Sequence, residues 1–183
     1  MVIAIDCDNV LCNLQEVVVN LFNERYRTHY TLNDFTEYDI MNVLPTAEAV
    51  KMKSIYGESG LYNLVKPLPG AQSALQKLVN MGHTVYVVTD AIPETYGEKV
   101  EFIRRYFPCI SAENIVCMKH KHLLKCDVLV EDNLDNLLAG QHYYRCLINW
   151  PWNAWDRDWV YGIERCYGFD DVLAAIDKIN DLE

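Results

Sequence analysis

Short apolar runs alternate with amphipathic segments along most of the chain. Five runs consist mainly of Val, Ile, Leu and other apolar residues, and they lie at 2–5, 84–88, 113–118, 126–131 and 145–150. Runs of this length and composition are typical of strands in a parallel sheet that is covered on both faces. The pattern therefore predicts five parallel strands.

Segments with an apolar residue every three or four positions separate these runs. A first helix is expected after Asn13, its predicted N-cap, with Glu16 as the capping-box partner. Further helices are expected at 70–82, 98–108 and about 170–180. Strands that alternate with helices predict an α/β fold, a Rossmann-like doubly wound parallel sheet with helices on both faces. The apolar face of the first helix is formed by Leu14, Val17, Val18, Leu21 and Phe22.

Residues 14–69 interrupt this alternation. The segment is rich in Asn, Thr, Tyr and Glu and lacks a clear strand. We therefore expect a small, mainly helical cap insertion at 14–69, placed over one edge of the sheet. Residues 1–13 and 70–183 then form the core.

Composition limits the classes of partner. The chain has 183 residues, of which 51% are apolar, and this suits one core domain with a modest insertion. Its net charge of −10 argues against a polymeric nucleic acid partner, because such partners are bound through Lys and Arg. A small-molecule substrate is the better expectation. The oligomeric state, a homodimer included, stays open.

Other features of the sequence bear on location. No apolar run approaches the roughly 18 residues that span a bilayer, and the N-terminal residues do not resemble a signal peptide. The seven cysteines are odd in number and scattered, which fits reduced thiols better than a disulfide framework. We therefore expect a cytoplasmic protein with no membrane association.

Polar side chains follow three of the predicted strands at the point where each ends. Asp6 and Asp8 follow the first, Thr89 ends the second, and Asp132 follows the fourth. Ligands of open α/β sheets bind beyond the carboxyl ends of the strands, so these side chains should converge. Adjacent carboxylates repel each other unless a cation relieves them, and carboxylate oxygens suit Mg²⁺. The sequence therefore predicts a Mg²⁺ site, with a hydroxyl and a lysine completing a phosphate cradle.

These motifs resemble those of the haloacid dehalogenase-like phosphohydrolases. The stretch "DCDNVL" is similar to the first motif of that superfamily, "VVTD" to the second and "LVEDNLDN" to the acidic fourth, and Lys99 lies where the lysine of the third is expected. Within the superfamily, "KPLPGAQ", "EKVEFIRRYF" and "NWPWN" resemble the 5'(3')-deoxyribonucleotidases. The resemblance covers most of residues 1–155.

The resemblance implies a Mg²⁺-dependent phosphomonoester hydrolase, most closely a 5'(3')-deoxyribonucleotidase that releases phosphate from (deoxy)nucleoside monophosphates. It implies that Asp6 is the nucleophile, which forms an aspartyl-phosphate, and that Asp8 is the acid and base. Thr89, the backbone amide of Asp90 and Lys99 are then expected to bind the phosphate, whereas the side chain of Asp90 suits a turn or a helix cap equally well.

The resemblance also assigns metal ligands. Asp6 and Asp132 bind the ion through their side chains, and Asp8 reaches it through its backbone carbonyl. Members of the family commonly have Asp-Asp in the fourth motif, whereas this chain has Glu131 before Asp132. We therefore assign Asp132 to the metal and place Glu131 beside it, without direct contact.

Several residues admit a second interpretation. Lys119 and Lys121 are alternatives to Lys99 for the lysine role. The cap aromatics Phe35, Tyr38, Tyr56 and Tyr62 are candidates to stack on a base, although each also suits the core of the cap.

Two further stretches carry chemistry of their own. Residues 117–126 contain two Cys and two His, but their spacing matches no common zinc pattern. Residues 149–159 carry all four tryptophans, and this favours a loop anchored by aromatics over a partner surface. The alternative functions are a phosphatase for another small phosphoester, a non-catalytic binding module on the same fold, and a zinc-dependent regulator.

Overall fold

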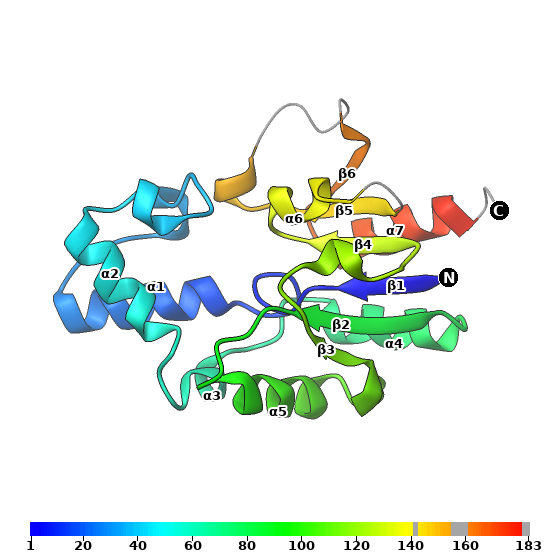
Figure 1. The fold of residues 1–183 in the computed structure, drawn as a ribbon, viewed down its shortest axis with the longest axis horizontal. Helices are drawn as coiled ribbons and strands as arrows, with labels where there is room; N and C mark the ends of the chain where they lie inside the picture. Colours follow the sequence, from blue (N-terminus) through cyan, green and yellow to red (C-terminus); the bar gives the residue numbers. More distant parts are fainter. Residues whose placement is uncertain (141–142, 155–160, 181–183) are drawn as a thin grey trace.

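The sheet has six parallel strands in the order β3-β2-β1-β4-β5-β6 (Figure 1). This computed structural model describes residues 1–140, 143–154 and 161–180. The strand order is that of a doubly wound sheet, so the predicted Rossmann-like α/β fold is confirmed. The strands are β1 (Val2–Ile5), β2 (Thr84–Thr89), β3 (Ile115–Cys117), β4 (Val128–Glu131), β5 (Tyr144–Ile148) and β6 (Ile163–Cys166).

The edges of the sheet differ from the prediction. The strand expected at 113–118 is shorter, because the 3-10 turn η3 (Ala112–Asn114) takes up its start. β6 was not predicted at all, because its sequence "IERC" interrupts two apolar residues with Glu164 and Arg165. Charged residues are common on edge strands, where they discourage pairing with other chains, and they hide the apolar pattern.

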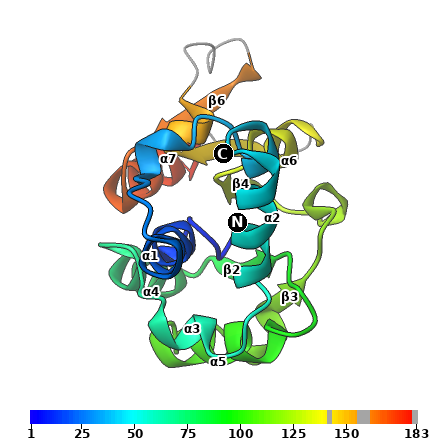
Figure 2. The same cartoon turned by 90° about the vertical axis from the view of Figure 1, so that its left-hand side faces the viewer.

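Helices cover both faces of the sheet. In Figures 1 and 2, α4 (Ala71–Asn80) and α7 (Phe169–Asn180) lie on one side and α6 (Leu134–Leu138) on the other. Ile3 packs into the core on the α4 side and Ala4 into the core on the α6 side, as the twofold period of a strand requires.

A further helix, α5 (Tyr96–Tyr106), packs into the same core as α4. It begins two residues before the predicted start at 98, whereas α4 and α7 lie close to their predicted ranges. None of the helices in the described parts of the chain combines the length and apolar character needed to cross a membrane.

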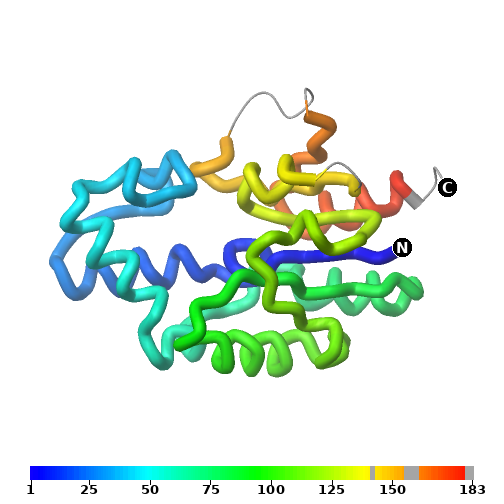
Figure 3. The backbone as a smooth tube through the Cα atoms, in the orientation of Figure 1, coloured from blue at the N-terminus to red at the C-terminus, as the bar shows by residue number. Residues whose placement is uncertain are grey.

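Residues 14–69 lie beyond the carboxyl ends of the strands, at the end of the molecule opposite both chain termini (Figure 1). The chain leaves and re-enters the sheet domain along two adjacent segments (Figure 3). Asn13 donates its N–H to the carbonyl of Lys66 at 3.1 Å, and Leu68 donates to that of Leu11 at 2.9 Å. The insertion contains α1 (Leu14–Tyr26), α2 (Thr46–Ile55), α3 (Leu61–Leu64) and the 3-10 turns η1 (Leu32–Asp34) and η2 (Ile40–Asn42).

The predicted capping box at the start of α1 is wrong. Asn13 is the N-cap residue, but its side chain accepts no hydrogen bond from the helix. Its Oδ1 instead accepts from the N–H of Lys66 at 2.8 Å, and its Nδ2 donates to Glu16 at 2.8 Å. The first-turn N–H of Gln15 is bound by Oδ1 of Asn9 at 2.8 Å. The Asn13 side chain is therefore used to join the two segments that enter and leave the insertion.

Candidate active site

Asp6 follows β1, the strand between β2 and β4, and it is buried. Its backbone N–H continues the sheet by donating to the carbonyl of Val130 at 3.0 Å. Its Oδ1 accepts from the N–H of Cys7 and lies 2.7 Å from Nζ of Lys121. The end of the central strand therefore fixes the orientation of this carboxylate.

A tight turn after Asp6 brings Asp8 to the site. The carbonyl of Cys7 accepts hydrogen bonds from the N–H groups of Leu11 at 2.8 Å and Cys12 at 3.2 Å, and Asn9 adopts a left-handed conformation with φ 57°. Asn tolerates this conformation better than most residues do. The turn therefore places Asp8 two residues after Asp6, with its side chain at the surface of a cavity.

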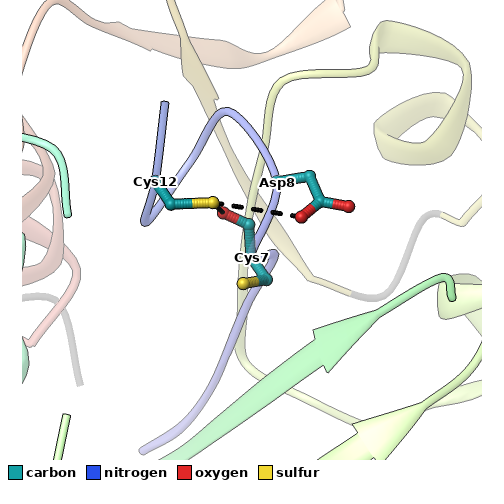
Figure 4. Close-up of side chains that lie close together, drawn as sticks. All are labelled: Cys7, Asp8 and Cys12. Carbon is teal, nitrogen blue, oxygen red and sulfur yellow. Dashed lines mark hydrogen bonds between the residues drawn. The ribbon is translucent and has the colours of Figure 1, made fainter. Parts of the chain in front are cut away.

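Both carboxylate oxygens of Asp8 have partners. Oδ2 lies 2.7 Å from Nζ of Lys99, and Oδ1 accepts from the hydroxyl of Tyr62 at 2.8 Å. The thiol of Cys12 approaches the same Oδ1 at 3.9 Å (Figure 4). Asp8 is thus held by one side chain from α5 and one from α3.

Three buried carboxylates meet at the ends of β1 and β4. Asp6, Glu131 and Asp132 each offer an oxygen, and these oxygens lie within 4.8 Å of one another. Burial raises the pKa of Asp6 to about 7, the charge of Glu131 adds to the rise, and Lys121 opposes it. Burial, with the charges of Glu131 and Asp6, raises the pKa of Asp132 well above its usual range. The three carboxyl groups of this cluster have one ammonium beside them, that of Lys121, and the cluster could hold a divalent cation.

The two acids of the fourth motif differ in their partners. Oε1 of Glu131 lies 2.7 Å from Nζ of Lys121 and accepts from Asn136 at 2.5 Å, and Oε2 accepts from the N–H of Asp132 at 3.1 Å. Asp132 makes longer bonds through Oδ2, to Asn9 at 3.4 Å and to Trp152 at 3.2 Å. Both carboxylate oxygens of Glu131 are therefore bound by protein donors, whereas the hydrogen bonds to the carboxylate of Asp132 are longer. Asp132 is the acid that can more easily bind a metal ion.

The predicted phosphate-binding residues lie at the end of β2. Nζ of Lys99 lies 3.1 Å from Oγ1 of Thr89, and it also donates to the carbonyl of Asp90. The side chain of Asp90 is exposed, and its Oδ1 accepts from the N–H of Ala91 at 2.9 Å, which is a turn contact. The structure thus brings Lys99 and Thr89 together beside Asp8, whereas the carboxylate of Asp90 faces its own turn.

Two buried lysines pair with different acids. Burial has the largest effect on the pKa of Lys99 and lowers it, but the charge of Asp8, its hydrogen bond and the charges of Cys7 and Asp6 together leave a net rise. Lys121 pairs with Asp6 and Glu131, which in the same way raise its pKa against the effect of burial. The sequence offered Lys121 only as an alternative to Lys99, and its one signal was its place in the basic stretch before β4.

A cavity of about 800 Å³ opens between the insertion and the ends of the strands. Asp8 and Lys99 line its inner part, and the predicted aromatics Phe35, Tyr38 and Tyr62 all contribute to its wall. Phe35 and Tyr62 are buried, whereas the side chain of Tyr38 is 55% exposed. Of the three rings, only that of Tyr38 is free to lie against a bound molecule.

Tyr56 and Gln15 also line this cavity, and the hydroxyl of Tyr56 donates to Oε1 of Gln15. The sequence showed Tyr56 only as one more aromatic of the insertion.

Two of the tryptophans support the site directly. The rings of Trp150 and Trp152 stack with centroids 5.1 Å apart. Nε1 of Trp150 donates to the carbonyl of Asn9 at 2.6 Å, and Nε1 of Trp152 donates to Asp132. The segment is anchored by aromatics as expected, and its contact with the acidic cluster was not foreseen. Trp155 and Trp159 lie outside the described residues.

The potential zinc ligands of residues 117–126 are not brought together. Cys117 is exposed on β3, although a buried position was expected, and Cys126 is buried. Among the described residues, the groups of three or more possible ligands are Asp6 with Glu131 and Asp132, and Cys7 with Asp8 and Cys12. Neither group includes a residue of 117–126.

Comparisons with known proteins identify the family. The family model described as "5' nucleotidase, deoxy (Pyrimidine), cytosolic type C protein" matches residues 1–176. The chain is 27% identical over 176 residues to the 5'(3')-deoxyribonucleotidase of Clostridium acetobutylicum, a match that covers 93% of this chain and 97% of the relative. It is 30% identical over 138 residues to the 5'(3')-deoxyribonucleotidase of Bacillus subtilis, covering 74% and 78%.

Solved structures show the same fold. A HAD family hydrolase from Deinococcus radiodurans, solved with bound phosphate and sodium, has a TM-score of 0.63 at 14% identity and covers 97% of this chain and 95% of its own. HAD denotes the haloacid dehalogenase-like superfamily, to which the sequence motifs pointed. The chain therefore has the fold of the HAD family hydrolases, belongs to the family of cytosolic type C 5' nucleotidases, and is a phosphatase of the nucleotidase type.

Proposed function

We propose that the chain hydrolyses (deoxy)nucleoside monophosphates with the help of Mg²⁺, through an aspartyl-phosphate formed on Asp6. One observation carries the proposal: Asp6 directly follows the central strand β1, and Asp8 comes two residues later. This strand lies between β2, which ends at Thr89, and β4, which Asp132 follows. The proposed nucleophile, the proposed acid and the residues proposed to bind phosphate thus lie together at the carboxyl ends of the strands. The names of the two nucleotidase relatives support the choice of substrate.

The acidic cluster fits a Mg²⁺ ion. Asp6, Glu131 and Asp132 are buried within 4.8 Å of one another and share a single buried ammonium, that of Lys121. Buried carboxylates are costly unless they are paired with positive charge, and Mg²⁺ accepts carboxylate oxygens. The side chains of Asp6 and Asp132, with the backbone carbonyl of Asp8, would hold the ion. When bound, Mg²⁺ supplies the positive charge that lets the phosphate approach an anionic site.

The contacts support a chemical role for each residue. Asp6 attacks phosphorus and Asp8 protonates the leaving oxygen, and Asp8 then takes a proton from the water that hydrolyses the aspartyl-phosphate. Lys121 holds Asp6 in its orientation for attack. Lys99 and Thr89, which are already in contact, bind phosphate oxygens and stabilise their negative charge.

The cavity supports a nucleoside as the leaving group. Its volume of about 800 Å³ leaves room beyond the phosphate site, and Tyr38 offers an exposed ring on its wall. Stacking of a base on an aromatic side chain contributes about 1–3 kcal/mol. The cavity therefore favours a phosphoester with a flat ring over one with a short aliphatic alcohol.

A phosphate-release assay over a panel of small phosphoesters, with and without Mg²⁺, tests the proposal. We expect nucleoside monophosphates to be the best substrates and activity to vanish in excess chelator. Full turnover after exhaustive chelation would contradict the metal requirement. A sugar or lipid phosphate preferred over every nucleotide would favour a phosphatase for another small phosphoester.

A further inference from the structure

We infer that Tyr62, from helix α3 of the insertion, is a positioning residue that orients Asp8 for its proton transfers. The inference rests on the proposed function, because it concerns the same site. It gives the insertion a part in the chemistry, in addition to any part in substrate binding. From the sequence, Tyr62 is expected only to stack on a base or to pack in the core of the cap.

The two oxygens of Asp8 face different surroundings. Oδ1 accepts from the hydroxyl of Tyr62 at 2.8 Å and lies 3.9 Å from the thiol sulfur of Cys12 (Figure 4). Oδ2 lies 2.7 Å from Nζ of Lys99. With a donor on each oxygen, the plane of the carboxylate is fixed.

These contacts indicate which oxygen of Asp8 transfers the proton. Lys99 also lies 3.1 Å from Oγ1 of Thr89, so Oδ2 is the oxygen on the side of the phosphate cradle. When phosphate binds, the ammonium of Lys99 turns from Oδ2 to a phosphate oxygen, and Oδ2 carries a proton in its place. In the first step this proton passes from Oδ2 to the leaving oxygen as its bond to phosphorus breaks and the bond from Asp6 to phosphorus forms. In the second step, Oδ2 takes a proton from the water that displaces Asp6 from phosphorus. Tyr62 keeps its own proton throughout and holds Oδ1.

Tyr62 is itself firmly placed. Its side chain is buried, and its ring centroid lies 6.2 Å from that of Phe102 and 5.5 Å from Nζ of Lys99. The start of α3 is tied to α5, because the N–H of Gly60 donates to Oε1 of Glu98 at 2.7 Å. Glu98 immediately precedes Lys99 on α5, so the two groups that hold Asp8 are anchored to each other.

The variant Tyr62→Phe isolates the hydroxyl, because it keeps the ring and its packing. The matched control is Tyr30→Phe, which removes another hydroxyl of the insertion, bonded to Glu48 at 2.6 Å and away from the cavity lining. Each protein is assayed for kcat/KM on thymidine 5'-monophosphate and on 4-nitrophenyl phosphate. The sugar oxygen needs a proton to leave, whereas 4-nitrophenolate leaves without one.

We expect Tyr62→Phe to lower kcat/KM about tenfold on the nucleotide and less than about twofold on 4-nitrophenyl phosphate. The reason is that acid catalysis by Asp8 speeds only the reaction of the nucleotide, whose leaving oxygen needs a proton. Tyr30→Phe should change neither value more than about twofold. Equal losses on both substrates, or no loss on either, would overturn the role of Tyr62 and leave the proposed function intact. Failure of the wild-type protein to hydrolyse either ester would contradict the proposed function itself.

Discussion

Nζ of Lys121 lies 2.7 Å from Oδ1 of Asp6, the side chain that we propose as the nucleophile. The same atom lies 2.7 Å from Oε1 of Glu131, and all three side chains are buried. One ammonium therefore holds two carboxylates at the end of the sheet and keeps Asp6 in a single orientation.

The variant Lys121→Met tests this relationship. It leaves Asp6 and Glu131 buried without their counter-charge, and breaking a buried pair in this way costs about 3–5 kcal/mol. We expect the free energy of unfolding in urea to fall by about that amount and turnover to approach background. The control is Lys125→Met, at an exposed lysine, with an expected change within about 0.5 kcal/mol. A Lys121 variant with near-normal stability and turnover would show that the contact is dispensable.

Substitutions of the two acids of the fourth motif should have different effects on Mg²⁺ dependence and on stability. Asp132→Asn should raise the Mg²⁺ concentration for half-maximal activity at least about tenfold, because it removes a proposed ligand. Glu131→Gln should leave that concentration nearly unchanged but reduce stability by about 1–3 kcal/mol, because a charged hydrogen-bond acceptor is lost. Mg²⁺ titrations of activity and urea unfolding measure both effects. The reverse pattern would place Glu131 on the metal.

The central part of the fold and site followed from the sequence because local patterns determine it. β1 and β4 are continuous apolar runs, and the acids that follow them must meet once the two strands are neighbours. The edge strand β6 escaped prediction because its Glu164 and Arg165 mask the apolar pattern.

Contacts between distant segments could not be predicted in this way. Which lysine meets which acid depends on the packing of α5 and of the turn η4 (Lys121–Leu123), and no spacing rule separates Lys99 from Lys121. The contact of Tyr62 with Asp8 joins residues 54 positions apart, and it depends on how the insertion folds back over the sheet.

The raised pKa of Asp6 predicts a dependence of stability on pH when metal is removed by a chelator. Burial, aided by Glu131, raises this pKa from 3.8 to about 7, so the folded protein binds a proton that the unfolded chain has released between these values. The stability from this group is therefore complete below about pH 4 and is lost as the pH rises through 7.

The measurement compares wild type with Asp6→Asn, which cannot titrate at this position. The free energy of unfolding of the wild type, relative to that of the variant, should fall between pH 4 and 8 in chelator. Added Mg²⁺ should weaken this slope. A difference that stays constant or rises with pH would contradict the raised pKa.

Tyr38 is expected to contribute to nucleotide binding. Its ring is 55% exposed and lies on the cavity wall, so Tyr38→Ala should raise KM for a nucleoside monophosphate about tenfold. KM for glycerol 2-phosphate should change far less, because that ester has no ring to stack on Tyr38. Tyr144→Ala removes a similarly exposed ring at the start of β5 and serves as the control. Equal changes in KM for both esters would show that Tyr38 only supports the insertion.

The most direct test of the proposed mechanism separates Asp6 from Asp8. Wild type, Asp6→Asn and Asp8→Asn are each mixed with an activated phosphoester in the presence of Mg²⁺, quenched, and weighed by mass spectrometry. Asp8→Asn keeps the nucleophile but lacks the base for the second step, so it should accumulate a phosphoryl group that maps to Asp6. Asp6→Asn should carry no phosphoryl group and should not turn over. Turnover by Asp6→Asn, or a phosphoryl group on any other residue, would contradict the mechanism.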